Sequence, residues 1–568
     1  MAQLPLCSDE EPERPPEKSQ LHDLMDFTTR IVRHILFSDD CVRFLTNLRS
    51  RVCLRTMYSG MGSEGIAMQW ILKALQVEGV LDQASAEGLF IWHSACDLSP
   101  LAQSVLLACP GGSGPSHIFT DILDRHGTKT RRELDTVHWS SPSTSSPTKR
   151  PRLRRSNAMS STGRPRTDGS DESDCVIMSS TALAPDSADQ IVAQDNTNDH
   201  LCRALDAIYQ TNTILMSPEA YNHDDTAYCC KHKARCCVRR QEDTEDTSGG
   251  GAQGASSCVG IHLLTGGLTC RDFSMFGAQS GIKGESTKPA LSFCGTFRAD
   301  RVDIGIIECA ALWDPSLCLA GLESSHVLVA CEPKPCPSRF GWPFTRLRYY
   351  GLILKKEHKL TKSWEVFSKP FEKPVTLTGH EFYVESPAAV ASHLKEAMRR
   401  VGSELMPGET ASYETHGLTG SQVTFLRVFR EIHKDKLQDM QTKKKEMPNG
   451  MDELICDLEQ NPDHRVRMST NGSMIGLLTH GTMWSDSAKR PLTKREILSL
   501  QGWPTISSVH GDKYEIPWAA FIEETSAERW TKLSGNGMHM NVLVLILCWA
   551  LACTELASTD YPEPEEVD

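Results

Sequence analysis

Residues 266–277 read GGLTCRDFSMFG, and this stretch is the most informative part of the chain. Its cysteine, Cys270, follows a pair of glycines and precedes Phe273, Ser274 and a further glycine. A thiolate is a strong nucleophile and can form covalent intermediates. Most cysteines are small buried side chains without a reactive role, so a structural cysteine is the alternative at this position.

A glycine-rich turn and two acidic strand ends precede this stretch. The turn is YSGMGSEG, residues 58–65, which follows a short apolar segment and precedes a helical pattern. Glycine lets a backbone approach a ligand closely because it has no side chain. Apolar segments then end in Asp97 and Asp121, and a carboxylate at such a strand end typically accepts hydrogen bonds from ribose hydroxyls. An ordinary turn and two strand-capping carboxylates are the alternative.

Two stretches after Cys270 supply an acid and two guanidinium groups. In IGIIECA, residues 304–310, an apolar strand reaches Glu308, and in GWPFTRLR, residues 341–348, Arg346 and Arg348 alternate with Leu347. Side chains two residues apart on a strand point to one face, so both guanidinium groups are expected on the same side. A water-exposed glutamate and two surface arginines are the alternative.

The C-terminal part predicts a capped helix and a buried helix. RPLTKREILSLQGWP, residues 490–504, places Thr493 three residues before Glu496, the spacing of a capping box, and Gly502 is expected to end the helix. After LSGNGMHM, residues 533–540, an apolar run over 542–552 is predicted to form a core helix. A bilayer span needs roughly 20 apolar residues, so no membrane segment is predicted.

In their order along the chain, these motifs resemble those of the cytosine-5 DNA methyltransferases. The family's nucleophile loop is usually written Gly-Gly-Pro-Pro-Cys-Gln-x-Phe-Ser-x-x-Gly, so Thr269 and Arg271 stand where the family has proline and glutamine. The resemblance covers roughly 300 residues in the core lobes. It implies an α/β fold with a Rossmann-like S-adenosylmethionine-dependent methyltransferase core and a mixed sheet. A smaller recognition lobe and a largely disordered insert would complete the chain.

At the base end, the resemblance implies methylation through a covalent adduct. Cys270 would add to C6 of a cytosine that has left the helix stack, which makes C5 nucleophilic. Glu308 would protonate or hydrogen-bond N3 of that base. Arg346 and Arg348 would bond the cytosine O2 and the nucleic-acid backbone.

At the cofactor end, the resemblance implies S-adenosylmethionine. Asp97 would accept hydrogen bonds from the ribose, and Asp121 would bond the adenine amino group. A loop containing Asn536 would complete the pocket. The residues that would flank the methionine and adenine parts are Tyr58, Gly60 and Gly62. Thr56 stands where the family commonly has an acidic residue.

Composition divides the 568-residue chain into segments of different character. The predicted segments are a tail and helix over 1–50, the cofactor half of the core over 51–124, a Ser- and Pro-rich, basic and cysteine-containing insert over 125–257, the catalytic half over 258–355, a target-recognition region over 356–487, a C-terminal core segment over 488–557 and an acidic tail over 558–568.

Charge and cysteine content add two interpretations. The net charge of −13 argues against a uniformly basic nucleic-acid surface, but the insert contains the basic run TKRPRLRR, residues 148–155. This run predicts a nuclear import signal or a phosphate contact, with a solvated linker as the alternative. The protein is therefore expected in the nucleus, and otherwise in the cytoplasm. The cysteines of residues 229–237 are interpreted as free thiols, with zinc ligation as the alternative, and no metal site is predicted.

The sequence thus predicts S-adenosylmethionine-dependent methylation of cytosine C5 in DNA, with DNA as the partner and no membrane. A tRNA substrate is one alternative, because one branch of the family acts on RNA. The other is a weak or inactive homologue that binds nucleic acid or a partner, which the changes at Thr269 and Arg271 favour. The sequence indicates neither a target preference nor a protein partner.

Overall fold

The computed structural model describes most of the chain outside the insert. The described residues are 18–126, 128–137, 203–215, 226–237, 260–268, 272–273, 280–284, 286–313, 315, 322–443, 453–464, 466–469 and 472–557. The basic run 148–155 and residues 269–271, with Cys270 among them, lie outside these ranges, so their predicted roles stay predictions.

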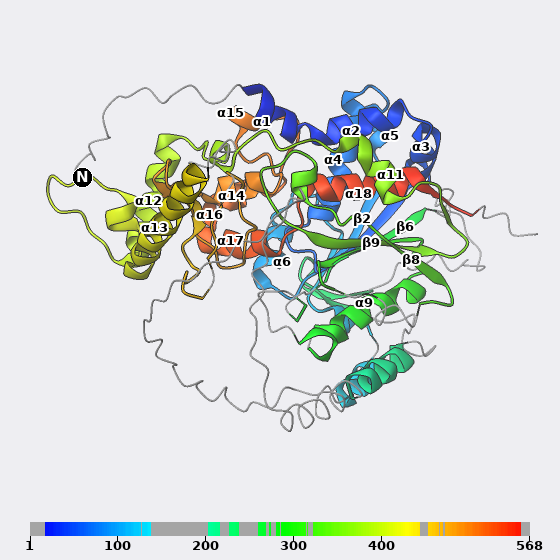
Figure 1. The fold of residues 1–568 in the computed structure, drawn as a ribbon. Coiled ribbons are helices and arrows are strands. Elements are labelled where there is room, and N and C mark those ends of the chain that lie inside the picture. Colours follow the sequence, from blue (N-terminus) through cyan, green and yellow to red (C-terminus); the bar gives the residue numbers. More distant parts are fainter. Residues whose placement is uncertain are drawn as a thin grey trace, which may run out of the picture.

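A mixed nine-stranded sheet forms the centre of the molecule (Figure 1). Its strand order is β5-β4-β3-β2-β1-β6-β7-β9-β8. The strands are β1 Val52–Met57, β2 Phe90–Cys96, β3 His117–Phe119, β4 Thr226–Cys229, β5 Ala234–Cys237, β6 Ile261–Gly267, β7 Ile304–Ala310, β8 His326–Ala330 and β9 Arg348–Lys355. Strands β3, β2, β1, β6 and β7 are parallel neighbours, and the outer strands pair antiparallel. The predicted fold class, a Rossmann-like core with a mixed sheet, is confirmed.

Helices cover both faces of the sheet, so its central strands are buried on both sides. Every residue of β1 and β7 is buried, as expected for strands packed on two sides. Alternate residues of β7 face opposite layers, so Ile306 joins the cluster of the N- and C-terminal helices while Ile307 joins the cluster of α9 (Thr287–Ala299). The first layer contains α2 Phe27–Leu36, α3 Cys41–Arg49, α4 Ser63–Val77 and α18 Met540–Cys553.

Helix α18 is the centre of that first layer. All of its residues are buried, and it packs against α2, α3 and α4. Together with α17 (Ala527–Asn536) it is long and apolar enough to cross a membrane by composition, but 94% of that apolar window is buried inside the fold. The apolar run over 542–552 therefore forms a core helix, as predicted.

A smaller lobe occupies much of the predicted recognition region. It contains α12 Pro387–Val401, α13 Gly420–Thr442 and a three-stranded sheet of β11 Ile455–Asp457, β12 Met483–Ser485 and β13 Arg490–Pro491. Its own apolar cluster gathers Phe429, Leu454 and Trp484. The remaining elements are α1 Lys18–Met25, α5 Gln83–Ala86, α6 Pro100–Leu107, η1 Ile122–Arg125, α7 Thr128–Thr136, η3 Gly281–Lys283, η4 Pro337–Arg339, β10 Lys359–Leu360, α11 Trp364–Ser368, η5 Lys369–Phe371, η6 Gly379–Phe382, η7 Tyr413–Gly417, α14 Lys494–Leu500, α15 Ser507–His510, α16 Ala519–Glu524 and β14 Thr554–Glu555.

Parts of the predicted insert belong to the folded core. Residues 203–215 form a helix, and β4 and β5 extend the main sheet beyond β3. These strands fell within the predicted insert because Ser, Thr, Pro and charged residues dominate much of 125–257, and four-residue strands do not stand out in such a composition.

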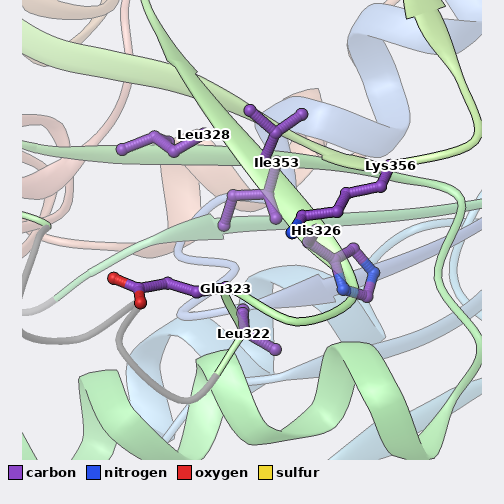
Figure 2. A pocket seen from close by; sticks show the side chains of 7 residues that line it. Leu322, Glu323, His326, Leu328, Ile353 and Lys356 are labelled. Atoms are coloured by element: carbon purple, nitrogen blue, oxygen red, sulfur yellow. The ribbon is translucent and has the colours of Figure 1, made fainter.

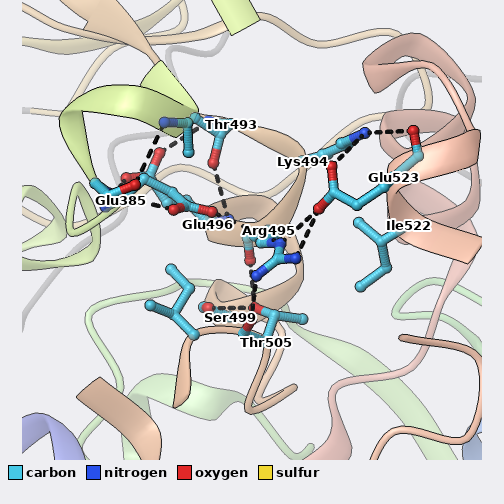
Figure 3. Close-up of polar contacts among 12 residues, drawn as sticks. Glu385, Thr493, Lys494, Arg495, Glu496, Ser499, Thr505, Ile522 and Glu523 are labelled. Atoms are coloured by element: carbon cyan, nitrogen blue, oxygen red, sulfur yellow. Dashed lines mark hydrogen bonds and ion pairs between the residues drawn. The ribbon is translucent and has the colours of Figure 1, made fainter. Parts of the chain in front are cut away.

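Helix α14 begins in a buried polar network around Glu496, and Figure 3 shows its contacts to Thr493 and to Glu385 in the segment before α12. Arg490 donates two hydrogen bonds of 2.7 Å to the Glu496 carboxylate. The same carboxylate accepts from the backbone N–H of Thr493 at the helix start and from that of Glu385 in the segment before α12. Thr493 and Glu496 form the predicted capping box, and Gly502 follows the helix end with φ +87°.

We expect Arg490→Ala to lower the free energy of unfolding by about 3–5 kcal/mol, because Glu496 would stay buried without its partner. Arg495 pairs with Glu523 in the same region but is 38% exposed, so Arg495→Ala should cost at most about 1 kcal/mol. Chemical denaturation of both variants measures the difference. Equal small losses would show that the buried pair stabilises the fold no more than the exposed one.

Candidate functional site

The predicted site residues gather at one edge of the sheet. The carboxyl ends of parallel strands meet at the same edge, where α/β proteins place their ligands. Tyr58 follows β1, Asp97 follows β2, Asp121 comes two residues after β3, and Glu308 lies near the end of β7. Residues that are far apart in the sequence are therefore brought together by the topology.

The turn after β1 has a backbone that only a glycine-rich sequence adopts easily. Tyr58, Gly60 and Gly62 have φ values of +56°, +51° and +75°. A Cβ atom at Gly62 would lie 2.5 Å from the Trp92 ring, so this glycine is needed for packing against β2. A Cβ atom at Gly60 would meet nothing within 4 Å, so Gly60 leaves open space at the edge.

Asp97 fastens this turn to the end of β2. Its Oδ2 accepts a 2.8 Å hydrogen bond from the Gly60 N–H, and its Oδ1 accepts one of 2.8 Å from the Ser99 N–H. Burial raises the pKa of the Asp97 carboxyl, while these two hydrogen bonds lower it. A carboxylate offers about four acceptor positions, so two remain for a ligand.

Tyr58 lies close to both acids. Burial raises the pKa of its hydroxyl well above the usual range, with further contributions from Cys96 and Asp121. The hydroxyl is buried and has no hydrogen-bond partner among the described residues. Asp121 itself caps η1, since its Oδ1 accepts a 2.9 Å hydrogen bond from the Leu123 N–H. A ligand between these groups would meet one free hydroxyl and two carboxylates.

Glu308 is a buried acid beside a guanidinium group. It is 5% exposed, and its Oε1 lies 3.2 Å from Arg348 Nε. Burial raises the pKa of Glu308, and Arg348 and Arg346 pull it down. Both arginines therefore act on this carboxyl, although only Arg348 belongs to β9 and Arg346 lies before that strand. A buried carboxyl beside a reacting base is a candidate general acid.

Arg346 is bonded to the loop that contains Asn536. Its Nη2 donates to the carbonyl oxygens of Gly535 and Gly537, at 3.0 and 2.7 Å. Asn536 is the last residue of α17 and its side chain is exposed. Met538, two residues after Asn536, reaches the end of β6, because its Cε would lie 3.0 Å from a Cβ atom at Gly267.

The end of β6 lies directly against Glu308. The Leu268 N–H donates a 2.8 Å hydrogen bond to the Glu308 carbonyl, and a Cβ atom at Gly267 would lie 3.3 Å from Glu308 Oε2. Two residues beyond Cys270, the buried Asp272 carboxylate accepts a 2.9 Å hydrogen bond from the Ser286 N–H. The described residues on both sides of 269–271 are thus anchored, one of them beside the candidate acid.

Glu64, in the first turn of α4, is a site residue that the sequence analysis missed. It is 1% exposed, and burial raises the pKa of its carboxyl from 4.5 to about 8, with the carboxylates of Glu308 and Asp97 adding to the effect. The nearby Thr265 hydroxyl lowers this pKa. The Oε1 atom is buried without a hydrogen-bond partner among the described residues.

The sequence feature that points to Glu64 is an acid directly after the glycine-rich turn, near Thr56, where an acid is expected. Thr56, which stands where the resembling family commonly has an acid, bonds Ser59 Oγ at 2.6 Å. Glu64 brings a carboxylate to the same turn from the following helix, in an otherwise apolar or small first turn. Glu64 thus lies near Asp97 and Glu308. The two arginines act on Glu308, whereas the acidic surroundings of Glu64 favour a positively charged ligand. These groups fit the sulfonium and amino groups of S-adenosylmethionine.

A cavity of about 300 Å³ lies elsewhere, along the edge strand β8 (Figure 2). Its walls include His326, Leu328, Ile353 and Lys356, and none of the predicted site residues lines it. The His326 ring is held by Ser325 Oγ at 2.8 Å from its Nδ1. This cavity is not the candidate site.

Of the comparisons with known proteins, the one with solved structures gave matches, and they include methyltransferases. No protein-family description matches the chain, and no curated protein matches it. A DNMT2 mutant from Spodoptera frugiperda is 11% identical with a TM-score of 0.33, and 88% of this chain and 99% of that chain are covered. The S. pombe Dnmt2 methyltransferase is 10% identical with a TM-score of 0.35, and the match covers 88% of this chain and 98% of that chain. The Entamoeba histolytica methyltransferase EhMeth is 9% identical with a TM-score of 0.31, and the match covers 88% of this chain and 98% of that chain. Likenesses of this strength do not establish a shared function.

We expect Glu64→Gln to stabilise the free protein at high pH. The folded-state pKa of about 8 exceeds the ordinary value of 4.5, so the wild type loses stability as pH rises between these values. Glutamine keeps the shape without the ionisation, so the variant should gain a few kcal/mol at pH 8, at about 1.4 kcal/mol per pKa unit.

Thermal unfolding at pH 5 and pH 8 measures this effect. The gain of the variant over wild type should be clearly larger at pH 8, while Glu87→Gln, at an exposed position of the same half of the core, should show no such pH dependence. A gain that is the same at both pH values would mean that Glu64 is not a buried neutral acid.

Proposed function

We propose that this chain transfers a methyl group from S-adenosylmethionine to C5 of cytosine in DNA. The observation that carries the proposal is the pairing of Leu268 with Glu308, which anchors the chain two residues before Cys270 beside a buried acid. The β6–β7 register thus brings the last described residues before Cys270 beside the proposed proton donor. The motif order from Tyr58 to Met540 supports the same assignment.

In this proposal, Cys270 is the nucleophile that attacks the cytosine and Glu308 is the proton donor. The Cys270 thiolate forms a bond to C6 of an extruded cytosine, while the Glu308 carboxyl donates its proton or a hydrogen bond to N3. Electron density then builds up at C5, which takes the methyl group. S-adenosylhomocysteine would leave as the methyl group is transferred. Loss of the C5 proton to water, whose bonding electrons re-form the C5–C6 double bond as the sulfur–C6 bond breaks, then restores the ring and releases the Cys270 thiolate. Arg348, at 3.2 Å from Glu308, keeps this carboxyl oriented.

The cofactor end of the proposal uses the groups around the glycine-rich turn. S-adenosylmethionine supplies an electrophilic methyl group when it is bound. Gly60 leaves room for it, and Asp97 and Asp121 offer acceptors for ribose hydroxyls and the adenine amino group. Glu64 faces the cationic part with its free oxygen. Arg346 acts through the Asn536 loop, whose carbonyls it holds, rather than through the base.

DNA in the nucleus is the proposed setting, and the basic run 148–155 supports it. A tRNA substrate uses the same chemistry and is a separate outcome of the test below. An inactive homologue is the third outcome, which the threonine and arginine beside Cys270 would explain. Thr269 lacks the fixed φ angle of proline, so an active enzyme is expected to be slow.

The decisive experiment incubates the full chain with S-adenosylmethionine and separate DNA and tRNA pools. Mass spectrometry of the nucleosides should detect 5-methylcytosine in the DNA, because the site is built for cytosine chemistry. Cys270→Ala should abolish the product while cofactor binding persists, and Cys41→Ala, in helix α3 away from the site, should leave it unchanged. Product in tRNA alone would replace DNA by RNA in the proposal, and no product in either pool would refute catalysis.

Cofactor binding gives a second test, by calorimetry. Asp121→Ala should weaken S-adenosylmethionine by about ten- to a hundredfold, the effect of one lost hydrogen bond to a charged group, about 1.5–3 kcal/mol. Glu64→Gln should weaken S-adenosylmethionine more than S-adenosylhomocysteine, because only the former carries the sulfonium charge.

The pH dependence of binding adds an independent check. A cationic ligand favours ionised Glu64, so wild-type affinity for S-adenosylmethionine should rise as pH increases toward 8. Equal losses for both ligands and a flat pH profile would remove Glu64 from the site.

A further inference from the structure

Four metal-ligating side chains meet at the end of the sheet opposite to β8. His117 comes from β3, Cys229 from the end of β4, His232 from the β4–β5 turn and Cys236 from β5. One ligand atom from each residue lies within 4.8 Å of all the others. They are separate from every residue of the candidate site described above.

Strand pairing brings this group together from distant parts of the sequence. Strand β4 pairs antiparallel with β3 at Phe119 and Cys229, and the Cys230 N–H donates a 2.8 Å hydrogen bond to the Ile118 carbonyl. Strand β5 pairs back onto β4, with Cys236 opposite Ala227. The hairpin thus carries three of the four side chains to β3, which holds the fourth.

The distances match a tetrahedral metal site. His232 Nδ1 lies 3.6 Å from Cys229 Sγ and 3.2 Å from Cys236 Sγ. Zinc bonds of about 2.0 Å to nitrogen and 2.3 Å to sulfur place such ligand atoms about 3.5 Å apart in a tetrahedron. The Nδ1 atom of His117 is buried and has no hydrogen-bond partner among the described residues, which leaves it available for a metal.

One backbone N–H beside these four residues can stabilise a thiolate. The Ile118 N–H points at Cys229 Sγ, 3.4 Å away, and a donor there stabilises a negative sulfur. The two other cysteines of the hairpin stand outside the group. Cys230 Sγ lies 3.4 Å from Gln103 Oε1, and Cys237 is the partner of Thr226 in the ladder.

We propose that His117, Cys229, His232 and Cys236 bind one zinc ion. Two thiolates and two imidazoles form a donor set that suits zinc, and four protein ligands leave no open position, so the ion is structural. It replaces the interpretation of these cysteines as free thiols. That interpretation followed from the absence of a second spaced pair near 229–237, and the fourth ligand, His117, lies far upstream in the chain.

The zinc ion fastens a late segment of the chain to an early strand. Strand β3 has three residues, and without the hairpin it would be the edge of the sheet. Cross-linking it to the hairpin joins His117 to Cys229, two positions that are far apart in the sequence. Because Asp121 follows β3 by two residues, the metal also steadies one side of the candidate cofactor site. The zinc proposal does not depend on the proposed activity.

Metal analysis of the purified full chain tests the proposal. After dialysis against a weak chelator under reducing conditions, elemental mass spectrometry should find about one zinc ion per chain. His232→Ala and Cys236→Ser change exposed or half-exposed positions, so they should fold and lose most of the zinc. His117→Ala should lose it as well. The matched controls Cys230→Ser and Cys237→Ser should keep it.

Two further measurements distinguish a zinc site from a cluster of unligated thiols and imidazoles. Cobalt in place of zinc should give the visible absorption of a tetrahedral thiolate site, absent in Cys236→Ser. Removing the metal with a strong chelator should increase hydrogen exchange in β3, β4 and β5 and leave β6 and β7 unchanged. A metal-free wild-type chain, a disulfide between Cys229 and Cys236, or equal zinc loss in the two control variants would overturn the proposal.

Discussion

The parallel pairing of β6 between β1 and β7 is the constraint on which the candidate site depends. In this register Met57 lies beside Gly266, and Gly267 lies beside Glu308. The chain leaving β1 therefore enters the glycine-rich turn next to the point where the chain leaving β6 enters the proposed nucleophile loop. A slip of one residue would turn Glu308 toward the opposite layer, because neighbouring side chains on a strand face opposite sides. The geometry of the site is thus a consequence of sheet register.

Several buried acids lie at this edge of the sheet, and their burial lowers the stability of the fold. Glu64 and Glu308 are buried and have raised pKa values, and Asp97 lies near them. Such groups reduce stability in the free protein, and strongly perturbed carboxyls gathered in one place indicate a ligand site. Apolar burial elsewhere, as in the fully buried α18, supplies compensating stability. Binding of a cation would turn the unfavourable acidic edge into a favourable contact.

Local features were predictable from the sequence, whereas features that depend on distant pairing were not. The Thr493–Glu496 capping box, the glycine after α14 and the core helix α18 each follow from a few neighbouring residues, and the structure has them. Glu308 was identified because an apolar strand leads to it. Glu64 was missed since its burial results from packing against β2 and β6. The zinc ligands were missed because His117 reaches the hairpin only through the β3–β4 pairing, and the role of Arg346 depends on a loop at the other end of the chain.

The central claim is that Cys270 attacks a cytosine held beside Glu308. The most direct measurement is covalent trapping on DNA that contains 5-fluorocytosine, in the presence of S-adenosylmethionine, because fluorine at C5 prevents the elimination that frees the enzyme. Peptide mapping of the trapped complex should locate the nucleotide on Cys270, and Glu308→Gln should trap much more slowly. A complex joined through another cysteine would contradict the account, as would the absence of any complex with a chain that binds the cofactor.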